Sequence, residues 1–258
     1  MKKSFIYFTI LISLFLASCK NNKLIINSLQ DLENKKIGVQ RGTTGEAFAS
    51  ENIKGSELTV YKTIFDAAED LRSSVIDAIV VDEYPAMEIV HQNQDFMIIR
   101  DKIFEENKEE YAFAVKKGNT ELLDSINKTI SKIKANGQYD ELIKCFFPAD
   151  QNVTVPKNSY PTAGKALKVG TNAQFFPFEY IDRKDITGFD IILSEYIAQD
   201  YNSTLQIVDM NFNALIKAVS FGSIDFIAAA MSITDERKEK VDFSIPYFSS
   251  EQVIIIKK

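Results

Sequence analysis

One stretch of the chain, residues 230–237, places hydroxyl side chains and an arginine directly after an apolar run. Residues 224–230 before it are predicted to form a buried strand. In open α/β sheets, small ligands bind at the carboxyl ends of strands. The guanidinium of Arg237 can pair with a carboxylate through two parallel hydrogen bonds, and Ser232 can add a hydroxyl donor. The stretch therefore favours a carboxylate-binding site, and the alternative is a plain salt-bridge cluster on the surface.

A second candidate is Asp82, which ends the fully apolar run 76–81. A carboxylate at the end of a buried strand is costly unless it is paired. Taken by itself, Asp82 is predicted to act as the N-cap of the helix predicted at 83–90.

The elements that must position these residues alternate between strand and helix patterns. Strand-like apolar segments are separated by amphipathic ones at 36–40, 58–61, 76–81 and 96–99, and the alternation restarts at 167–171. This pattern predicts an α/β fold whose sheets are mostly parallel. Between the two series, residues 148–165 mix proline with polar residues and lack apolar periodicity, so we expect a linker there.

Composition excludes several classes of function. The chain has 258 residues and a net charge of −6, which argues against nucleic acid as a partner. One histidine and two cysteines leave little material for a metal site. We expect no metal and no cofactor.

The N-terminus has the pattern of an export signal. Lys2 and Lys3 precede an apolar run at 5–17 that is too short to span a bilayer comfortably, and Leu16-Ala17-Ser18-Cys19 resembles a bacterial lipobox. We expect residues 1–19 to be a lipoprotein signal peptide and Cys19 to be lipidated, which would anchor the protein in the periplasm or at the cell surface. An ordinary signal peptide with an incidental cysteine is the alternative.

Two groups of residues together resemble one family, the bacterial periplasmic amino-acid-binding proteins of ABC transporters (solute-binding protein family 3, glutamine- and histidine-binding type). Residues 167–258 resemble its N-terminal half, through Val169-Gly170-Thr171, Phe175, Pro177-Phe178-Glu179, Gly188-Phe189-Asp190, the segment 231–237 and Phe243-Ser244-Ile245-Pro246-Tyr247. Residues 28–147 resemble its C-terminal half, through Asp31-Leu32, Lys36-Ile37-Gly38-Val39, Gly42-Thr43-Thr44, Asp77-Ala78, Asp82 and Asn136-Gly137-Gln138-Tyr139-Asp140.

The resemblance implies a type II periplasmic binding protein fold, with two α/β lobes joined by two hinge strands. The halves occur in swapped order, which resembles a circular permutant whose usual termini are joined by the linker 148–165. A fragment of a tandem fusion is the alternative. Mapped onto this sequence, lobe 2 would hold residues 24–108 plus 251–258, and lobe 1 would hold 112–147 plus 166–247. The apolar last strand would then pair in the same sheet as residues 36–40 or 76–81.

The resemblance also implies roles at the site. Arg237 would pair with the α-carboxylate of an amino acid, helped by Ser232 and Thr44, and Asp82 would accept the α-ammonium. Phe175 and Phe212 would flank the ligand. The other expected site residues are Gln40, Thr43, Asn172 and Ala230, while Glu179 is expected to be structural. Because Asn172 stands where relatives that bind cationic ligands carry aspartate, a neutral or polar side chain is favoured.

The function implied is a non-enzymatic, monomeric receptor that delivers a free amino acid to an ABC permease. A ligand-sensing receptor subunit is an alternative. An enzyme of the cyclohexadienyl-dehydratase type is another, but it would need a general acid in the cleft. The sequence offers only Asp82 for that role, and the ligand's ammonium group would occupy it.

Overall fold

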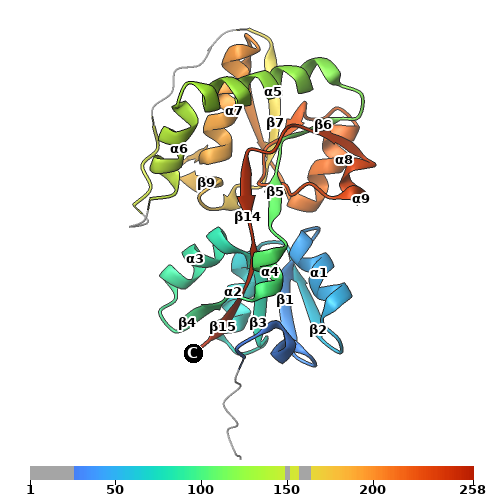
Figure 1. Cartoon of the computed structure of the whole chain (residues 1–258), viewed down its shortest axis with the longest axis vertical. Helices are drawn as coiled ribbons and strands as arrows, with labels where there is room; N and C mark the ends of the chain where they lie inside the picture. The colour runs from blue at the N-terminus through green and yellow to red at the C-terminus, as the bar shows by residue number, and fades with distance from the viewer. Residues whose placement is uncertain (1–25, 149–151, 157–163) are drawn as a thin grey trace, which may run out of the picture.

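The computed structural model describes residues 26–148, 152–156 and 164–258. The expected signal peptide with Cys19 and much of the expected linker lie outside the described residues. The chain forms two lobes, one above the other in Figure 1, and two strands run between them. These strands, β5 (Glu109–Tyr111) and β14 (Phe248–Ser250), pair antiparallel to each other.

The lower lobe is built on a five-stranded sheet with the order β2-β1-β3-β15-β4. Its strands are β1 (Lys36–Gln40), β2 (Glu57–Tyr61), β3 (Ala78–Asp82), β4 (Phe96–Ile99) and β15 (Gln252–Lys257). Helices α2 (Ile64–Arg72) and α3 (Glu83–Gln92) cover one face of the sheet. The 3-10 helix η1 (Leu29–Leu32) and the helices α1 (Thr44–Asn52) and α4 (Lys102–Glu106) cover the other.

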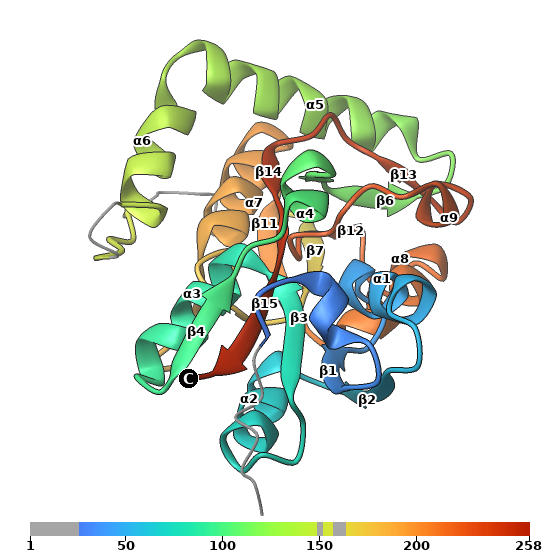
Figure 2. The same ribbon diagram turned by 60° about the horizontal axis from the view of Figure 1, so that its bottom comes forward.

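Strand β15, the last of the chain, lies between β3 and β4 and runs antiparallel to both (Figure 2). Successive side chains of a strand point to opposite faces. Accordingly, Val253 and Ile255 are buried under α2 and α3, while Ile254 and Ile256 are buried on the other face. The expectation that this apolar strand pairs with the segment near 76–81 is confirmed.

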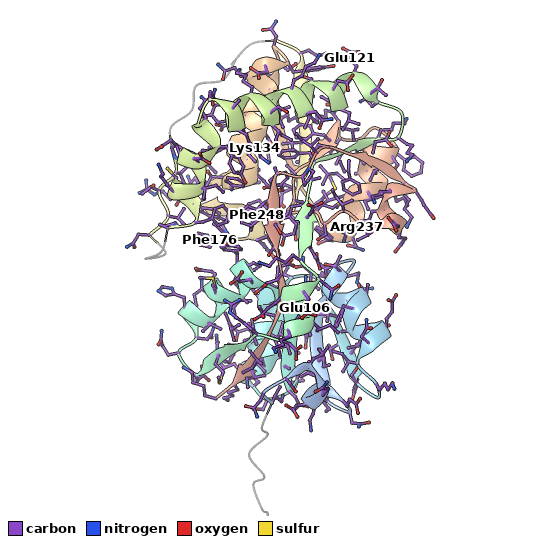
Figure 3. The ribbon with its side chains drawn as sticks, in the orientation of Figure 1. Glu106, Glu121, Lys134, Phe176, Arg237 and Phe248 are labelled. Atoms are coloured by element: carbon purple, nitrogen blue, oxygen red, sulfur yellow. The ribbon has the colours of Figure 1, made fainter. Side chains whose placement is uncertain are left out.

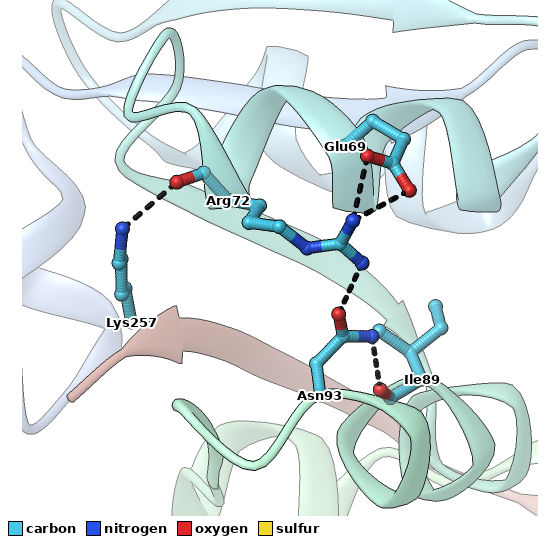
Figure 4. A network of polar contacts seen from close by, with 5 residues as sticks. All are labelled: Glu69, Arg72, Ile89, Asn93 and Lys257. Carbon is cyan, nitrogen blue, oxygen red and sulfur yellow. Dashed lines mark hydrogen bonds and ion pairs between the residues drawn. The ribbon is translucent and has the colours of Figure 1, made fainter.

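Polar contacts also hold the end of β15 in the lower lobe. Lys257 Nζ donates to the backbone oxygen of Arg72 at the end of α2, over 2.8 Å (Figure 4). The Arg72 guanidinium in turn donates to Glu69 and to Asn93, and Asn93 Nδ2 donates to the Ile89 oxygen at 2.6 Å. Lys257 therefore ties the C-terminal strand to the end of α2, and Arg72 links α2 to Asn93 at the end of α3.

The upper lobe contains a second five-stranded sheet, with the order β11-β7-β12-β6-β13. Its strands are β6 (Ala114–Lys116), β7 (Ala166–Thr171), β11 (Thr204–Asp209), β12 (Phe226–Ile227) and β13 (Val241–Phe243). Strands β11, β7 and β12 are parallel, whereas β6 is antiparallel to both of its neighbours. A small antiparallel sheet adds β8 (Gln174–Phe175), β9 (Glu179–Asp182) and β10 (Asp185–Thr187).

Helices cover both faces of the upper sheet. One face packs against α5 (Thr120–Ala135), α6 (Gln138–Phe146) and α7 (Phe189–Asp200). The other face packs against α8 (Leu215–Ser220), which follows the 3-10 helix η2 (Phe212–Ala214), and the short α9 (Asp235–Lys238) lies beside β13. The helical spacing of Leu122, Ile126, Ile130 and Ile133 predicts the apolar face of α5, and all four side chains are buried.

Candidate functional site

A small cavity lies where the two lobes meet. Every site residue predicted from the sequence lines it: Gln40, Thr43, Thr44 and Asp82 from the lower lobe, and Asn172, Phe175, Phe212, Ala230, Ser232 and Arg237 from the upper lobe. Glu179 and Ala229 complete the lining. The volume is about 10 Å³, which is the space of roughly one water molecule. A ligand larger than a water molecule can therefore enter only when the lobes move apart.

Arg237, on α9, is held by backbone groups. Thr234 caps this helix, because its hydroxyl accepts a hydrogen bond from the Arg237 amide. The guanidinium donates from Nη1 to the Ser232 oxygen at 2.7 Å and from Nη2 to the Gly42 oxygen at 2.9 Å, and it lies 5.4 Å from the centre of the Phe212 ring. Figure 3 labels Arg237 on the side of the upper lobe that faces the lower lobe.

The charge of Arg237 is not neutralised by an ion pair with any described residue. Its acidic neighbours in sequence bind lysines instead, Asp235 to Lys238 and Glu236 to Lys240. Burial lowers the pKa of the guanidinium, and the nearby charges of Glu109 and Asp82 act in the opposite direction. The alternative of a surface salt-bridge cluster is therefore wrong for Arg237, which is 7% exposed.

Asp82 is the last residue of β3 and precedes α3, yet its side chain makes no capping hydrogen bond. Its carboxylate instead accepts a hydrogen bond from the hydroxyl of Tyr111, on the hinge strand β5. Burial raises the pKa of Asp82 to about 7, and the charge of Glu109 adds to the effect. Asp82 thus occupies the N-cap position without capping the helix, and its carboxyl group lines the cavity.

Glu109 is a residue near the site that the sequence analysis missed. Its Oε2 atom accepts hydrogen bonds from Thr44 Oγ1, over 2.8 Å, and from Ser232 Oγ, while Oε1 accepts one from Gln252 Nε2 at 3.2 Å. The strand period of two could have indicated it, because Glu109 and Tyr111 lie on the same face of β5. Thr44 and Ser232, expected to serve a ligand carboxylate, thus have a protein carboxylate as their acceptor.

Gln40 and Asn172 meet across the cleft. Gln40 Nε2 donates to Asn172 Oδ1 over 2.9 Å, and Asn172 Nδ2 donates to the Met210 oxygen over 3.1 Å. Both amides belong to residues predicted at the site, and they join β1 of the lower lobe to the end of β7. This hydrogen bond must break when the lobes separate.

Glu179, for which the sequence predicts a structural role, also lies at the cavity. It begins β9, is 1% exposed and lines the cavity, yet neither of its carboxylate oxygens has a hydrogen-bond partner among the described residues. Burial raises its pKa well above the ordinary value, and the charges of Asp190, Asp209 and Asp82 add to this. A buried carboxyl group without a partner is expensive, so Glu179 is suited to meet a hydrogen-bond donor or a cation in the cavity.

The strand predicted over 224–230 is shorter in the structure. Strand β12 covers only Phe226–Ile227, and Ala230 has a φ of 44°, in the left-handed region. Asp190 Oδ2 accepts hydrogen bonds from the Ala230 amide at 2.8 Å and from the Tyr247 hydroxyl at 2.6 Å. The bond to the Ala230 amide fixes the backbone at this residue, which lines the cavity together with Ser232. Burial raises the pKa of Asp190 to about 7.

Within the described ranges, we find no group of three or more His, Cys, Asp and Glu side chains placed to hold a metal ion. The same part of the chain contains no helix that combines the length and the apolar character needed to cross a bilayer.

Comparison with known families gives a match over most of the chain. The sequence model of the bacterial extracellular solute-binding proteins, family 3, matches residues 16–149 and 167–258. The chain belongs to this family. The match is interrupted at residues 150–166, which overlap the linker predicted at 148–165.

Several known proteins are similar to this chain over part of their length. A probable histidine-binding protein of Campylobacter jejuni is 40% identical over 43% of this chain and 44% of its own. The arginine-binding extracellular protein ArtP of Bacillus subtilis is 38% identical over 39% of this chain and 40% of its own. The L-cystine-binding protein TcyJ of Escherichia coli is 32% identical over 51% of this chain and 48% of its own. The chain thus spans about half the length of the curated relatives it matches.

A solved structure is also similar to part of this family 3 chain. The arginine-bound form of domain 1 from TmArgBP is 44% identical, covers 36% of this chain and 80% of its own, and superposes with a TM-score of 0.33.

Proposed function

We propose that this protein is an extracytoplasmic receptor that captures a free amino acid between its lobes and delivers it to an ABC importer. The observation that carries the proposal is that a buried guanidinium, Arg237, and a buried carboxyl group, Asp82, line the same interlobe cavity. These charges complement the α-carboxylate and the α-ammonium of an amino acid. Two N–H groups of the Arg237 guanidinium donate to backbone oxygens. Its remaining N–H groups can donate to the ligand carboxylate.

Glu179 supports a ligand whose side chain ends in N–H donors. Glu179 lines the cavity, and neither of its buried carboxylate oxygens has a hydrogen-bond partner in the described chain. A cationic side chain would satisfy both oxygens and would favour the ionised carboxylate over the neutral acid. This weighs against the expected neutral side chain. Because relatives are named for histidine and arginine, L-arginine is our first choice of probe.

The swapped order of the halves belongs to the same proposal. In the lower lobe, Ile26 and Ile256–Lys258 line one surface pocket, so the first described residue and the C-terminus are neighbours. Circular permutation is tolerated where chain ends lie close together at the surface. We propose that the chain is a circular permutant in which residues 148–165 join the usual termini. We also propose that the protein is a monomer tethered to a membrane through a lipidated Cys19.

A thermal-shift screen against the standard amino acids tests ligand capture. A ligand that binds only the folded protein stabilises it by about 2.7 kcal/mol at a hundredfold excess over Kd. We expect L-arginine or another cationic amino acid to raise the melting temperature. No shift with any amino acid would overturn the proposal. Uptake of the labelled ligand by cells with and without this chain then tests delivery to an importer.

A further inference from the structure

The two hydroxyl groups expected to bind a ligand carboxylate are both used by Glu109. Thr44 Oγ1 and Ser232 Oγ each donate to the same carboxylate oxygen, Oε2. A hydroxyl group carries a single proton and can donate one hydrogen bond at a time. While these bonds hold, neither hydroxyl has a proton for the ligand.

The three side chains come from different parts of the molecule. Thr44 begins α1 in the lower lobe, Ser232 belongs to the upper lobe, and Glu109 lies on the hinge strand β5 between them. Its second oxygen accepts from Gln252, the first residue of β15 and close to the other hinge strand. The full set of bonds forms only when the lobes are together.

We infer that Glu109 is a positioning residue that latches the lobes in the closed arrangement, and that the ligand carboxylate is left to Arg237. The part that concerns the ligand rests on the proposed function, whereas the latch does not. Each lobe contributes a hydroxyl donor to the same acceptor oxygen. The loss of Glu109 therefore removes the contacts with Thr44 and Ser232 together, and also the contact with Gln252.

The charge of Glu109 has a second effect on the site. Among neighbouring charges it has the largest influence on the Arg237 guanidinium, and it helps to raise the pKa of Asp82. A variant that removes the latch therefore also removes a negative charge, and the two effects must be separated. Glu109→Gln and Glu109→Ala provide this separation. Both substitutions remove the negative charge, but only the glutamine side chain is long enough to place an acceptor oxygen where the carboxylate oxygen lies.

The experiment compares both variants with the unaltered protein and with Glu110→Ala. Glu110 is the exposed neighbour on the same strand, and its backbone oxygen accepts a hydrogen bond from the Ile233 amide of the upper lobe. Small-angle X-ray scattering of the free protein should give a larger radius of gyration for Glu109→Ala alone. Calorimetry with L-arginine should give an affinity about tenfold weaker for Glu109→Ala than for Glu109→Gln, which corresponds to about 1.4 kcal/mol.

Equal radii of gyration for Glu109→Ala and Glu110→Ala would overturn the latch. So would a Glu109→Gln variant that is as expanded as Glu109→Ala. If unaltered protein does not bind L-arginine, the choice of ligand fails while the scattering result still decides the latch. The Thr44→Val, Ser232→Ala double variant lacks both hydroxyl donors. If its radius of gyration equals that of the unaltered protein, the inference is also contradicted.

Discussion

The guanidinium of Arg237, in the upper lobe, donates a hydrogen bond of 2.9 Å to the backbone oxygen of Gly42, in the lower lobe. Gly42 has a φ of 79°, and a Cβ atom there would lie 2.9 Å from Cβ of Asn213. The proposed carboxylate anchor is thus also a contact between the lobes, at a point where the two backbones approach too closely for a side chain. Arg237 therefore contributes both to the proposed ligand binding and to the closure of the lobes.

Replacing Arg237 by alanine should weaken L-arginine binding by at least about tenfold to a hundredfold, since a hydrogen bond to a charged group contributes about 1.5–3 kcal/mol. Calorimetry measures the change. Lys240→Ala is the matched control, because this exposed residue forms only a surface pair with Glu236, and such pairs contribute little. Equal binding by Arg237→Ala and the control would remove Arg237 from the site.

Two buried acidic groups, Asp82 and Asp190, predict a pH dependence for stability opposite to that for binding. Asp82 and Asp190 have pKa values raised from 3.8 to about 7, mainly by burial. The folded protein therefore binds protons more tightly than the unfolded chain, and stability falls as pH rises from about 4 to about 7. The free protein should melt at a higher temperature at pH 5 than at pH 8.

Ligand affinity should change in the other direction, because an ionised Asp82 is needed to accept an ammonium group. Calorimetry should find weaker L-arginine binding at pH 5 than at pH 8. Asp82→Asn should bind weakly at both values and reduce the pH dependence of melting, with an unchanged circular dichroism spectrum. An affinity in Asp82→Asn equal to that of the unaltered protein would show that the carboxylate has no ligand role.

Glu179 should distinguish a cationic from a neutral side chain of the same shape. L-Citrulline replaces the guanidinium of L-arginine with a neutral urea group, so the unaltered protein should prefer arginine by about tenfold or more, as expected for hydrogen bonds to charged groups. Glu179→Gln should lose most of this preference. If citrulline binds the unaltered protein as well as arginine does, the carboxylate of Glu179 does not distinguish a cationic from a neutral ligand side chain.

Deleting residues 251–258 should unfold the lower lobe. The deletion removes four buried aliphatic side chains, Val253, Ile254, Ile255 and Ile256. Burial of each contributes about 1.5–3 kcal/mol, and the sum is comparable with a typical stability of about 5–15 kcal/mol. Strands β3 and β4 would also lose their shared partner.

A chain cut within residues 157–163 is the control for this deletion. That stretch of the predicted linker has no periodic apolar pattern, and the elements on both sides, α6 and β7, belong to the upper lobe. The cut protein should melt like the intact one. A deletion variant that also melts and binds normally would contradict the role of β15 and the permutant proposal.

The sequence by itself determined the elements and the general position of the site. Apolar runs that end in Asp82 or lead into residues 231–237 place polar side chains at strand ends, and these ends meet at the edge where sheets bind ligands. The apolar character of 253–256 on both faces required a position inside a sheet, and the structure shows that position between β3 and β4.

Tertiary structure decided which polar groups are partners. Glu109 and Ser232 are 123 residues apart, and Gln40 and Asn172 are 132 residues apart. No local spacing predicts such hydrogen bonds, because they depend on how the two lobes meet. Likewise, only the packing shows that Glu179 lines the cavity and that neither of its carboxylate oxygens has a hydrogen-bond partner in the described chain.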